Sequence, residues 1–336
     1  MTTISAKIIK DSISPEKIRL TTIQLRYPRF VHAELMTHRV FSRNASSSRA
    51  VPVERLIEDI KRDTAMPIHW GKNQPGMQAR EECNNLVNIF RPDRSPGGRG
   101  DYILHSCDKI TTWEWARDQA IENALAFHKA GYHKQIVNRL LEPFSHINVL
   151  VTSTYWQNWF YLRDHPDAQP EICKLAQEMF KAMVDSEPKL REPGQWHLPY
   201  VTDEDMKELQ GRGLEFDPQG VHYTRSPVTD IAIKLSVARC ARVSYLTHDM
   251  KKPDIDADVN LYEKLAVAKP LHVSPAEHQA TPDKPWFDNF SFGWKHIKQH
   301  GNFYGWRQYR KMLKGEFVNE YDVDVQTERL KDGYVW

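Results

Sequence analysis

Long apolar runs and an excess of one charge are both missing from this chain of 336 residues. No stretch approaches the ~18 consecutive apolar residues of a membrane span, and the N-terminal MTTISAK lacks the apolar core of a signal peptide. We therefore expect a cytoplasmic protein with no membrane partner. Lys+Arg number 46 and Asp+Glu 44, a balance that excludes a strongly basic coat for polymeric nucleic acid but is compatible with a local basic pocket for one small phosphate.

Cysteine is scarce, and the motifs of several common site classes are absent. The four cysteines, Cys83, Cys107, Cys173 and Cys240, are widely separated and form no Cys-x-x-Cys pair. We expect reduced, buried thiols, with no disulfide framework and no metal site. The sequence also has no Walker loop, no Gly-x-Gly-x-x-Gly after a strand, no His-Glu-x-x-His and no Gly-x-Ser-x-Gly. These absences exclude the ordinary P-loop, dinucleotide, metalloprotease and esterase sites.

What is present is a mixture of strand-like and helix-like segments. Residues rich in β-branched side chains predict two strands, at 4–10 and 17–27. Apolar spacing predicts helices at 30–36, 53–60, 134–141, 145–163, 172–183, 230–246 and 258–268, and one that ends near Gly131. Residues 37–52 are interpreted as a loop or a frayed helix end, and 91–101 as a loop by composition.

Three parts of the chain are expected to differ in role. Residues 1–185 hold the two strands and most of the helical pattern of a catalytic domain. Residues 186–228, rich in Pro, Gly and charge, are interpreted as an insertion or arm with one short helix at 202–210. Residues 229–336 complete the same domain.

The segment 37–52 carries an unusual density of hydroxyl and guanidinium groups. It contains His38, Arg39, Ser42, Arg43, Asn44, Ser46, Ser47, Ser48 and Arg49. Arginine forks and serine hydroxyls suit phosphate oxygens, especially beside a helix end with free N–H groups. A solvated capping loop is the alternative interpretation of the same composition.

This segment resembles the signature of the flavin-dependent thymidylate synthases. That signature is Arg-His-Arg, seven residues, Ser, and usually Gly-Arg-Tyr. Here it reads Thr37-His38-Arg39, seven residues, Ser47, and then Ser48-Arg49-Ala50. The preceding run LRYPRFVHAELM is similar to the strand, proline and helix that lead into the signature in that family.

Further blocks agree with the same family. GYHKQIVNRLLEPF (131–144) resembles a family helix whose arginine corresponds to Arg139. TSTYWQNWFYLRDHPDAQPEI (152–172) is similar to a segment with an Asn, here Asn158, five residues before a key Arg, here Arg163. ARVSY (241–245) and SPAEH (274–278) resemble the two opening blocks of the family.

The order of these blocks differs from that of the family. The two opening blocks stand last here, which indicates a circular permutation, a change that is tolerated when chain termini lie close together on the surface. The resemblance implies an α+β fold in which helices flank a small, mostly antiparallel sheet. Because the family builds its sites between subunits of a homotetramer, it also implies a homo-oligomer, a tetramer or a dimer.

The resemblance implies a reaction and its cofactors. The family methylates C5 of the uracil of deoxyuridylate, with methylene-tetrahydrofolate as the carbon donor and with FAD, reduced by NADPH, as the hydride source. Implied catalytic residues are Arg163, which would stabilise charge on the ring, and Ser47. Implied nucleotide contacts are Glu34, Ser47, Ser48, Arg49, Arg139 and Arg163. Implied flavin contacts are His38, Arg39, Ser42, Asn44, Asn158 and Ser244.

Several positions depart from the family pattern and leave alternatives open. Thr37 replaces an Arg, Ala45 a Glu, Ala50 a Tyr and Glu34 a Gln, while Thr152 and Thr154 replace a flavin-contacting Asn and Arg. We consider Arg307 and Arg310 as replacements for a lost guanidinium. Because a carboxylate can accept a hydrogen bond from the exocyclic amine of cytosine, Glu34 keeps open a C5-methylase or hydroxymethylase of a cytosine nucleotide. A non-catalytic nucleotide-binding relative is the third hypothesis.

Overall fold

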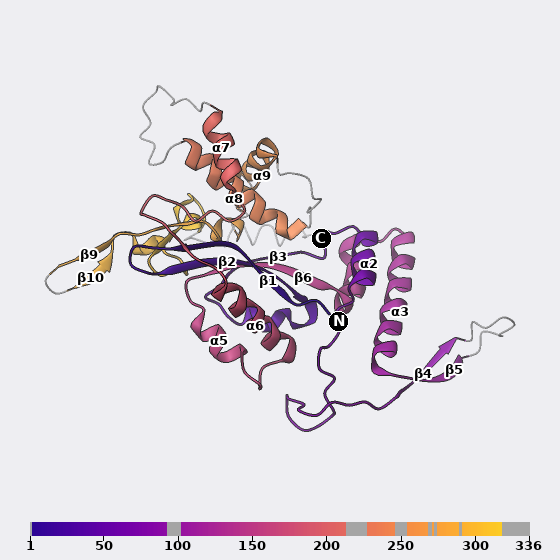
Figure 1. Cartoon of the computed structure of the whole chain (residues 1–336). Coiled ribbons are helices and arrows are strands. Elements are labelled where there is room, and N and C mark those ends of the chain that lie inside the picture. The colour runs from indigo at the N-terminus through magenta and orange to yellow at the C-terminus, as the bar shows by residue number, and fades with distance from the viewer. Residues whose placement is uncertain are drawn as a thin grey trace, which may run out of the picture.

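A five-stranded sheet forms the centre of the computed structural model, which describes residues 2–92, 102–212, 227–245, 254–267, 271, 274–288 and 291–317 (Figure 1). The strand order is β3-β6-β2-β1-β7. The bounds are β1 Ser5–Ile13, β2 Arg19–Pro28, β3 Ser42–Ala45, β6 His146–Ser153 and β7 Lys189–Leu190. All pairs are antiparallel except β1 with β7, which confirms the predicted α+β class with a mostly antiparallel sheet.

One face of the sheet is apolar and lies on two helices, α5 (Gln157–Arg163) and α6 (Pro170–Val184) (Figure 1). Alternate residues of β2 and β6 point to this face because side chains alternate along a strand. They form one buried cluster with the apolar stripe of α6, which includes Ile23, Leu25, Val149, Val151, Ile172, Leu175 and Met179. The apolar residues whose spacing predicted a helix at 172–183 are the side chains of α6 that fill this core.

The opposite face of the sheet is buried and polar. The strand register places Ser42, Thr152 and Thr22 side by side on β3, β6 and β2. The Thr22 and Thr152 hydroxyls are 2.7 Å apart, and Thr152 Oγ1 lies 2.8 Å from Nδ1 of His278. Burial lowers the pKa of His278 to about 3, so the imidazole is neutral, and the layer is held by hydrogen bonds without a buried charge.

A helical layer covers the polar face. It consists of α7 (Asp203–Gly211), α8 (Pro227–Tyr245) and α9 (Ile255–Val267), and α8 contacts both β3 and β6 (Figure 1). The short elements η3 (Ser274–Glu277), β8 (Ala280–Pro282), η4 (Ile297–Gln299), β11 (Trp306–Gln308) and η5 (Tyr309–Met312) complete the cover. The chain therefore folds its last third back onto the strands of its first half.

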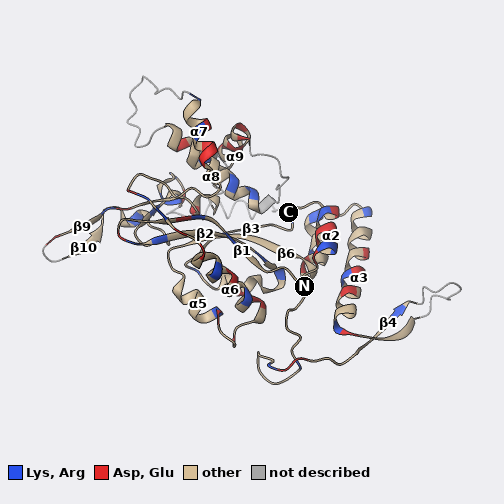
Figure 2. Ribbon diagram, in the orientation of Figure 1, with Lys and Arg blue, Asp and Glu red and all other residues tan. Residues whose placement is uncertain are grey.

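A third group of helices lies beside the sheet. It contains α2 (Val53–Arg62), α3 (Lys109–Lys129), α4 (Lys134–Val137) and η2 (Asn138–Phe144), which share one apolar cluster. Two hairpins extend away on opposite sides of the molecule, β4 (Val87–Pro92) with β5 (Tyr102–Cys107) and β9 (Pro285–Phe287) with β10 (Phe292–Trp294) (Figure 1). Lys, Arg, Asp and Glu are interspersed along α2 and α3 (Figure 2), as expected for a balanced net charge.

Two sequence predictions were wrong. The predicted helix at 145–163 is the strand β6, a turn and the helix α5. The run HINVLVTS is buried on both sides, so it shows no clear alternation and resembles a buried helix segment. The signature segment is not only a loop, because Ser42–Ala45 pair with β6 as the edge strand β3. Of the loop predicted at 91–101, Arg91 and Pro92 belong to β4, and 93–101 lie outside the described residues.

Two smaller predictions concern cysteine and the membrane. All four cysteines are free, as predicted, but only Cys240 is fully buried. Among the described residues, no helix is both long enough and apolar enough to cross a bilayer.

Candidate functional site

Arg163, the last residue of α5, is bound to the signature segment. Its Nε donates to Nε2 of His38 at 3.1 Å, and its Nη2 donates to Oγ1 of Thr37 at 3.0 Å. Thr37 in turn donates its hydroxyl proton to the carbonyl oxygen of Glu34 at 2.7 Å. The structure thus brings Arg163 to Glu34, Thr37 and His38, from which it is separated by more than a hundred residues in the sequence.

His38 is held in a fixed orientation by aromatic neighbours. Its ring centroid lies 5.7 Å from that of Phe41 in a stacked arrangement and 4.7 Å from that of Trp159 in an edge arrangement. Burial lowers the pKa of His38, and the cations of Arg163 and Arg43 lower it further. The neutral imidazole can therefore accept a hydrogen bond from Arg163. Because His38 lies in the turn that follows α1 (His32–Met36), this bond anchors the guanidinium of Arg163 to the end of α1.

A pH effect on activity follows from the lowered pKa of His38. Protonation of Nε2 would remove the acceptor of Arg163 and place two cations in contact. We expect kcat/KM to stay constant as the pH falls through about 6.5, the usual histidine value, and to decline only below it. A pH–rate profile tests this, and His38→Gln, which keeps an acceptor that does not titrate, should remove the decline. A wild-type midpoint at or above the usual value would contradict the assignment.

Glu34 and Arg163 line one cavity of about 810 Å³. Its other walls are the segment 68–80 and the residues that lead into α6. The backbone N–H of Ile68 donates to Oε1 of the buried Glu171 at 2.9 Å, and the Gln78 side chain donates to the carbonyl oxygen of Asp167 at 2.7 Å. These bonds hold the wall in place, and the volume is within the usual range for small-molecule sites.

The Glu34 carboxylate and one terminal nitrogen of Arg163 have no partner within the part of the chain that the structure describes. Among the described residues, the Glu34 carboxylate has no hydrogen-bond or ion-pair partner, and Arg163 donates only through Nε and Nη2. The second terminal nitrogen of Arg163 therefore keeps its donors. A carboxylate and a guanidinium on one cavity offer an acceptor and a donor to a polar ring edge.

Ser42 and Asn44 lie on the buried side of β3. Asn44 donates to the carbonyl oxygen of Cys240 at 2.5 Å. The Ser42 hydroxyl donates to Oδ1 of Asn302 at 3.2 Å and accepts from Nε2 of Gln308 at 3.1 Å. Both side chains join the signature strand to the C-terminal third, so their described bonds are within the protein.

A second cluster lies beyond the other end of β3. The Ser48 hydroxyl donates to Oε1 of Glu142 at 2.6 Å, and Arg139 donates to the same oxygen at 3.1 Å. Asn138 donates to the carbonyl oxygens of Ser48 and Val51 at 2.7 and 3.0 Å. The loop that carries Ser47, Ser48 and Arg49 is therefore fixed to η2.

This second cluster contains the residues assigned to a phosphate. Arg49 is exposed and has no partner among the described residues, and the Arg139 side chain is 60% exposed. Both guanidinium groups remain accessible to an anion. No described hydrogen bond or ion pair links this cluster to Arg163.

The residues assigned to FAD fall into two sets. The side chains of Arg39 and Asn158 are exposed and make no described hydrogen bond. In the sequence these residues are next to His38 and Trp159, whose rings are in contact. Their free donors fit the phosphates and the polar ring edge of a flavin. Ser42 and Asn44, with the buried Thr152, instead lie on the polar face of the sheet, opposite the face that α5 covers. Ser244 is within α8, but its side chain is outside the described part of the chain.

The blocks predicted to be permuted lie against the signature strand. Both α8, which carries 241–245, and η3, which begins 274–278, contact β3. Glu277 pairs with Arg310, and burial raises the pKa of this carboxyl although Arg310 opposes the shift. Arg307 instead donates to Gln299 at 2.8 Å. Arg310, one of the two arginines considered as a replacement for the lost guanidinium, is therefore attached through Glu277 to the block 274–278.

The sequence did not indicate two residues that hold the signature turn. Asn302 donates to the carbonyl oxygen of Val40 at 2.9 Å, and Gln308 donates to the Ser42 hydroxyl at 3.1 Å. Both lie in a segment where aromatic residues dominate the pattern. The residues around Asn302 contain no sequence pattern that predicts a hydrogen bond to a strand 260 positions away.

Comparison with known proteins gives one family match. The model of Thy1, described as thymidylate synthase complementing protein, matches residues 14–189. The solved UMP/dUMP methylase PolB from Streptomyces cacaoi, bound with 5-Br UMP, is 17% identical, covering 55% of this chain and 90% of its own, with a TM-score of 0.37. Its complex with 5-Br dUMP is 15% identical, with coverages of 55% and 91% and a TM-score of 0.36. No curated protein matches the chain.

Proposed function

The chain belongs to the Thy1 family of flavin-dependent thymidylate synthases, whose model matches more than half of it, and on that basis we propose that it attaches a one-carbon unit to C5 of a pyrimidine nucleotide. The preferred substrate is deoxyuridylate and the preferred product thymidylate. Methylene-tetrahydrofolate is the proposed carbon donor, FAD the redox cofactor and NADPH its reductant.

One observation carries this proposal: the orientation of Arg163 at the cavity. Carbon 5 of a pyrimidine is a weak nucleophile, and negative charge develops on the ring oxygens as it attacks the donor carbon. A guanidinium already fixed by His38 and Thr37 can stabilise that charge without reorganising. Arg163 lines a cavity of about 810 Å³, and its second terminal nitrogen, which has no described partner, is available to a ligand there.

The proposed reaction replaces the proton at C5 with the one-carbon unit of the folate. A bond forms between C5 and the methylene carbon, the C5 proton leaves, and the bond from that carbon to the folate nitrogen breaks. Arg39 and Asn158 would hold the flavin, which when reduced by NADPH would supply the hydride that converts the methylene unit into methyl. The protein binds, orients and screens the nucleotide, with Arg49, Arg139 and Ser47 as the proposed seat of the 5′-phosphate.

A cytosine nucleotide is the second candidate substrate, and the carboxylate of Glu34 favours it. This carboxylate lines the same cavity as Arg163 and has no described partner. It can accept from the exocyclic amine of cytosine, whereas it can meet uracil only at N3–H. If water replaces the hydride, the product is a hydroxymethyl pyrimidine and no reductant is consumed.

Product masses distinguish these possibilities. The protein is incubated with methylene-tetrahydrofolate, FAD, NADPH and either deoxyuridylate or deoxycytidylate, and the nucleotides are analysed by mass spectrometry. We expect a gain of one CH2 group on deoxyuridylate that requires both FAD and NADPH. A gain of CH2O without NADPH indicates hydroxymethylation. Unchanged nucleotides with both bases would contradict the proposed function.

A further inference from the structure

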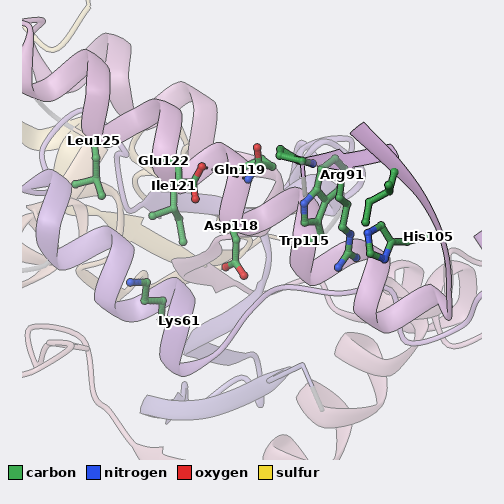
Figure 3. Close-up of a pocket in the computed structure, with 11 residues that line it drawn as sticks. Lys61, Arg91, His105, Trp115, Asp118, Gln119, Ile121, Glu122 and Leu125 are labelled. Carbon is green, nitrogen blue, oxygen red and sulfur yellow. Dashed lines mark hydrogen bonds between the residues drawn. The ribbon is translucent and has the colours of Figure 1, made fainter. Parts of the chain in front are cut away.

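A cavity of about 840 Å³ lies between the hairpin β4–β5 and the helices α2 and α3 (Figure 3). It has no lining residue in common with the cavity that holds Glu34 and Arg163. Much of its wall is apolar and comes from the hairpin and α3, with the side chains Pro92, Ile103, Trp115, Ile121 and Leu125. This volume, and an apolar wall with a few polar groups, are typical of a site for a small organic molecule.

Arg91 of β4 has two donors in the cavity wall and no acceptor for them. Its guanidinium carbon lies 5.3 Å from the ring centroid of Trp115, with His105 beside it (Figure 3). The Nε and Nη2 atoms are buried and have no hydrogen-bond partner. They lie on the same edge of the planar guanidinium, which binds a carboxylate or a phosphate through two parallel hydrogen bonds. Because a buried donor without an acceptor is costly, this edge favours a ligand that supplies a pair of oxygens.

The cations of the cavity lack counter-charges, whereas its two carboxylates have partners. Asp118 pairs with Arg117 at 2.8 Å, and Glu122 accepts a hydrogen bond from the glutamine side chain one turn before it at 3.2 Å. Lys61 of α2 and Arg91 line the same cavity and form no ion pair with any described residue. The unneutralised charge of the cavity is therefore positive, which favours an anionic ligand.

We propose that this cavity binds a small organic anion that carries a ring. The carboxylate or phosphate of the ligand accepts from Nε and Nη2 of Arg91, and the ring packs on the apolar side chains of the hairpin and α3. Lys61 lies at the opposite end of the cavity from Arg91 and adds a charge that attracts the ligand (Figure 3). Because side chains commonly change rotamer on binding, a rotation of the half-buried Arg91 side chain opens its donor edge. The site is independent of the proposed reaction.

Calorimetric titration of the full-length chain tests the site with two probes. Thymidine triphosphate offers a phosphate and folic acid a carboxylate, and each carries a ring. We expect at least one of them to bind with a Kd below about 1 mM. Arg91→Gln should weaken that binding by about 10-fold or more, the effect of losing a charge-assisted bidentate contact. Lys61→Gln should weaken it by a smaller factor, and the probe that binds identifies the anionic group.

Two control variants separate this site from the rest of the chain. Arg62→Gln removes the cation next to Lys61 that does not line the cavity, and it should keep the wild-type Kd. Arg163→Ala alters the reaction cavity and should leave the same binding unchanged, so a failed reaction and a failed site give different results. Absence of binding by both probes, or binding that Arg163→Ala weakens and Arg91→Gln does not, overturns the proposal.

Thermal melting gives a second readout. A ligand that binds only the folded chain raises its melting temperature, so the probe that binds should stabilise the wild type and should stabilise Arg91→Gln less. Without a ligand, Arg91→Met should melt no lower than the wild type, because it removes buried donors that lack an acceptor. A lower melting temperature of Arg91→Met, together with an unchanged Kd for the probe, would assign Arg91 to holding the hairpin alone and contradict the site.

Discussion

Replacing Arg163 with alanine is expected to lower kcat/KM by at least about 100-fold, the cost of losing one preorganised donor to a developing negative charge. The loss should appear mainly in kcat, because the interaction strengthens as charge builds on the ring. Folding should change little, because Arg163 is partly exposed and, within the described ranges, its side chain binds only Thr37 and His38. Steady-state kinetics with thermal melting measures both effects.

Two further variants test whether the effect is specific to the guanidinium of Arg163. Arg163→Lys keeps the charge but loses the planar fork that meets His38 and Thr37 together, so most of the activity should still be lost. Lys181→Ala removes an exposed cation of α6 that does not line the cavity and should leave kcat/KM unchanged. If Arg163→Ala lowers nucleotide affinity in a chain that shows no turnover, the non-catalytic relative becomes the better hypothesis.

Replacing Arg239 with methionine is expected to lower the free energy of unfolding by about 3–5 kcal/mol, the cost of breaking a buried ion pair from one side. Arg239 on α8 binds Asp205 of α7 at 2.5 and 2.9 Å and Asp258 of α9 at 2.8 Å. Asp258 is fully buried, so removing the guanidinium leaves a carboxylate with less compensation. Denaturant unfolding of the wild type and the variant measures the difference.

The Arg239 prediction has a matched control on the same helix. Lys234 of α8 pairs with Glu263 at 2.6 Å, with side chains 33% and 50% exposed. Lys234→Met should cost no more than about 1 kcal/mol, because exposed ion pairs contribute little. Equal losses from the two variants would contradict the prediction, because the buried network would then contribute no more to stability than an exposed ion pair.

Local patterns predicted the elements in which one face meets the core. The stripe of α6 and the short helix α1 were predicted, and α1 carries Glu34 to the cavity. The strand β6 was mistaken for a helix because it is buried on both sides, where a strand loses its alternation. The resemblance implied that Arg163 and His38 belong to one site, and the structure brings the two side chains into contact.

The remainder of the site depends on contacts between distant parts of the chain. Nothing near Ser42 indicates that Asn302 and Gln308 will bind it. Nothing near Arg139 indicates that Glu142 also binds Ser48. Such hydrogen bonds form only after the sheet, α8 and the C-terminal segment have packed, so single-sequence patterns do not encode them.

Release of tritium from C5 of a labelled pyrimidine nucleotide tests the central claim most directly. Every proposed product, methyl or hydroxymethyl, requires loss of the C5 proton, so the readout does not depend on the identity of the product. We predict release into water from deoxyuridylate or deoxycytidylate that requires methylene-tetrahydrofolate and disappears in Arg163→Ala. Complete retention of tritium in both nucleotides, with folate donor, FAD and NADPH present, would contradict the assignment of this cavity to C5 chemistry.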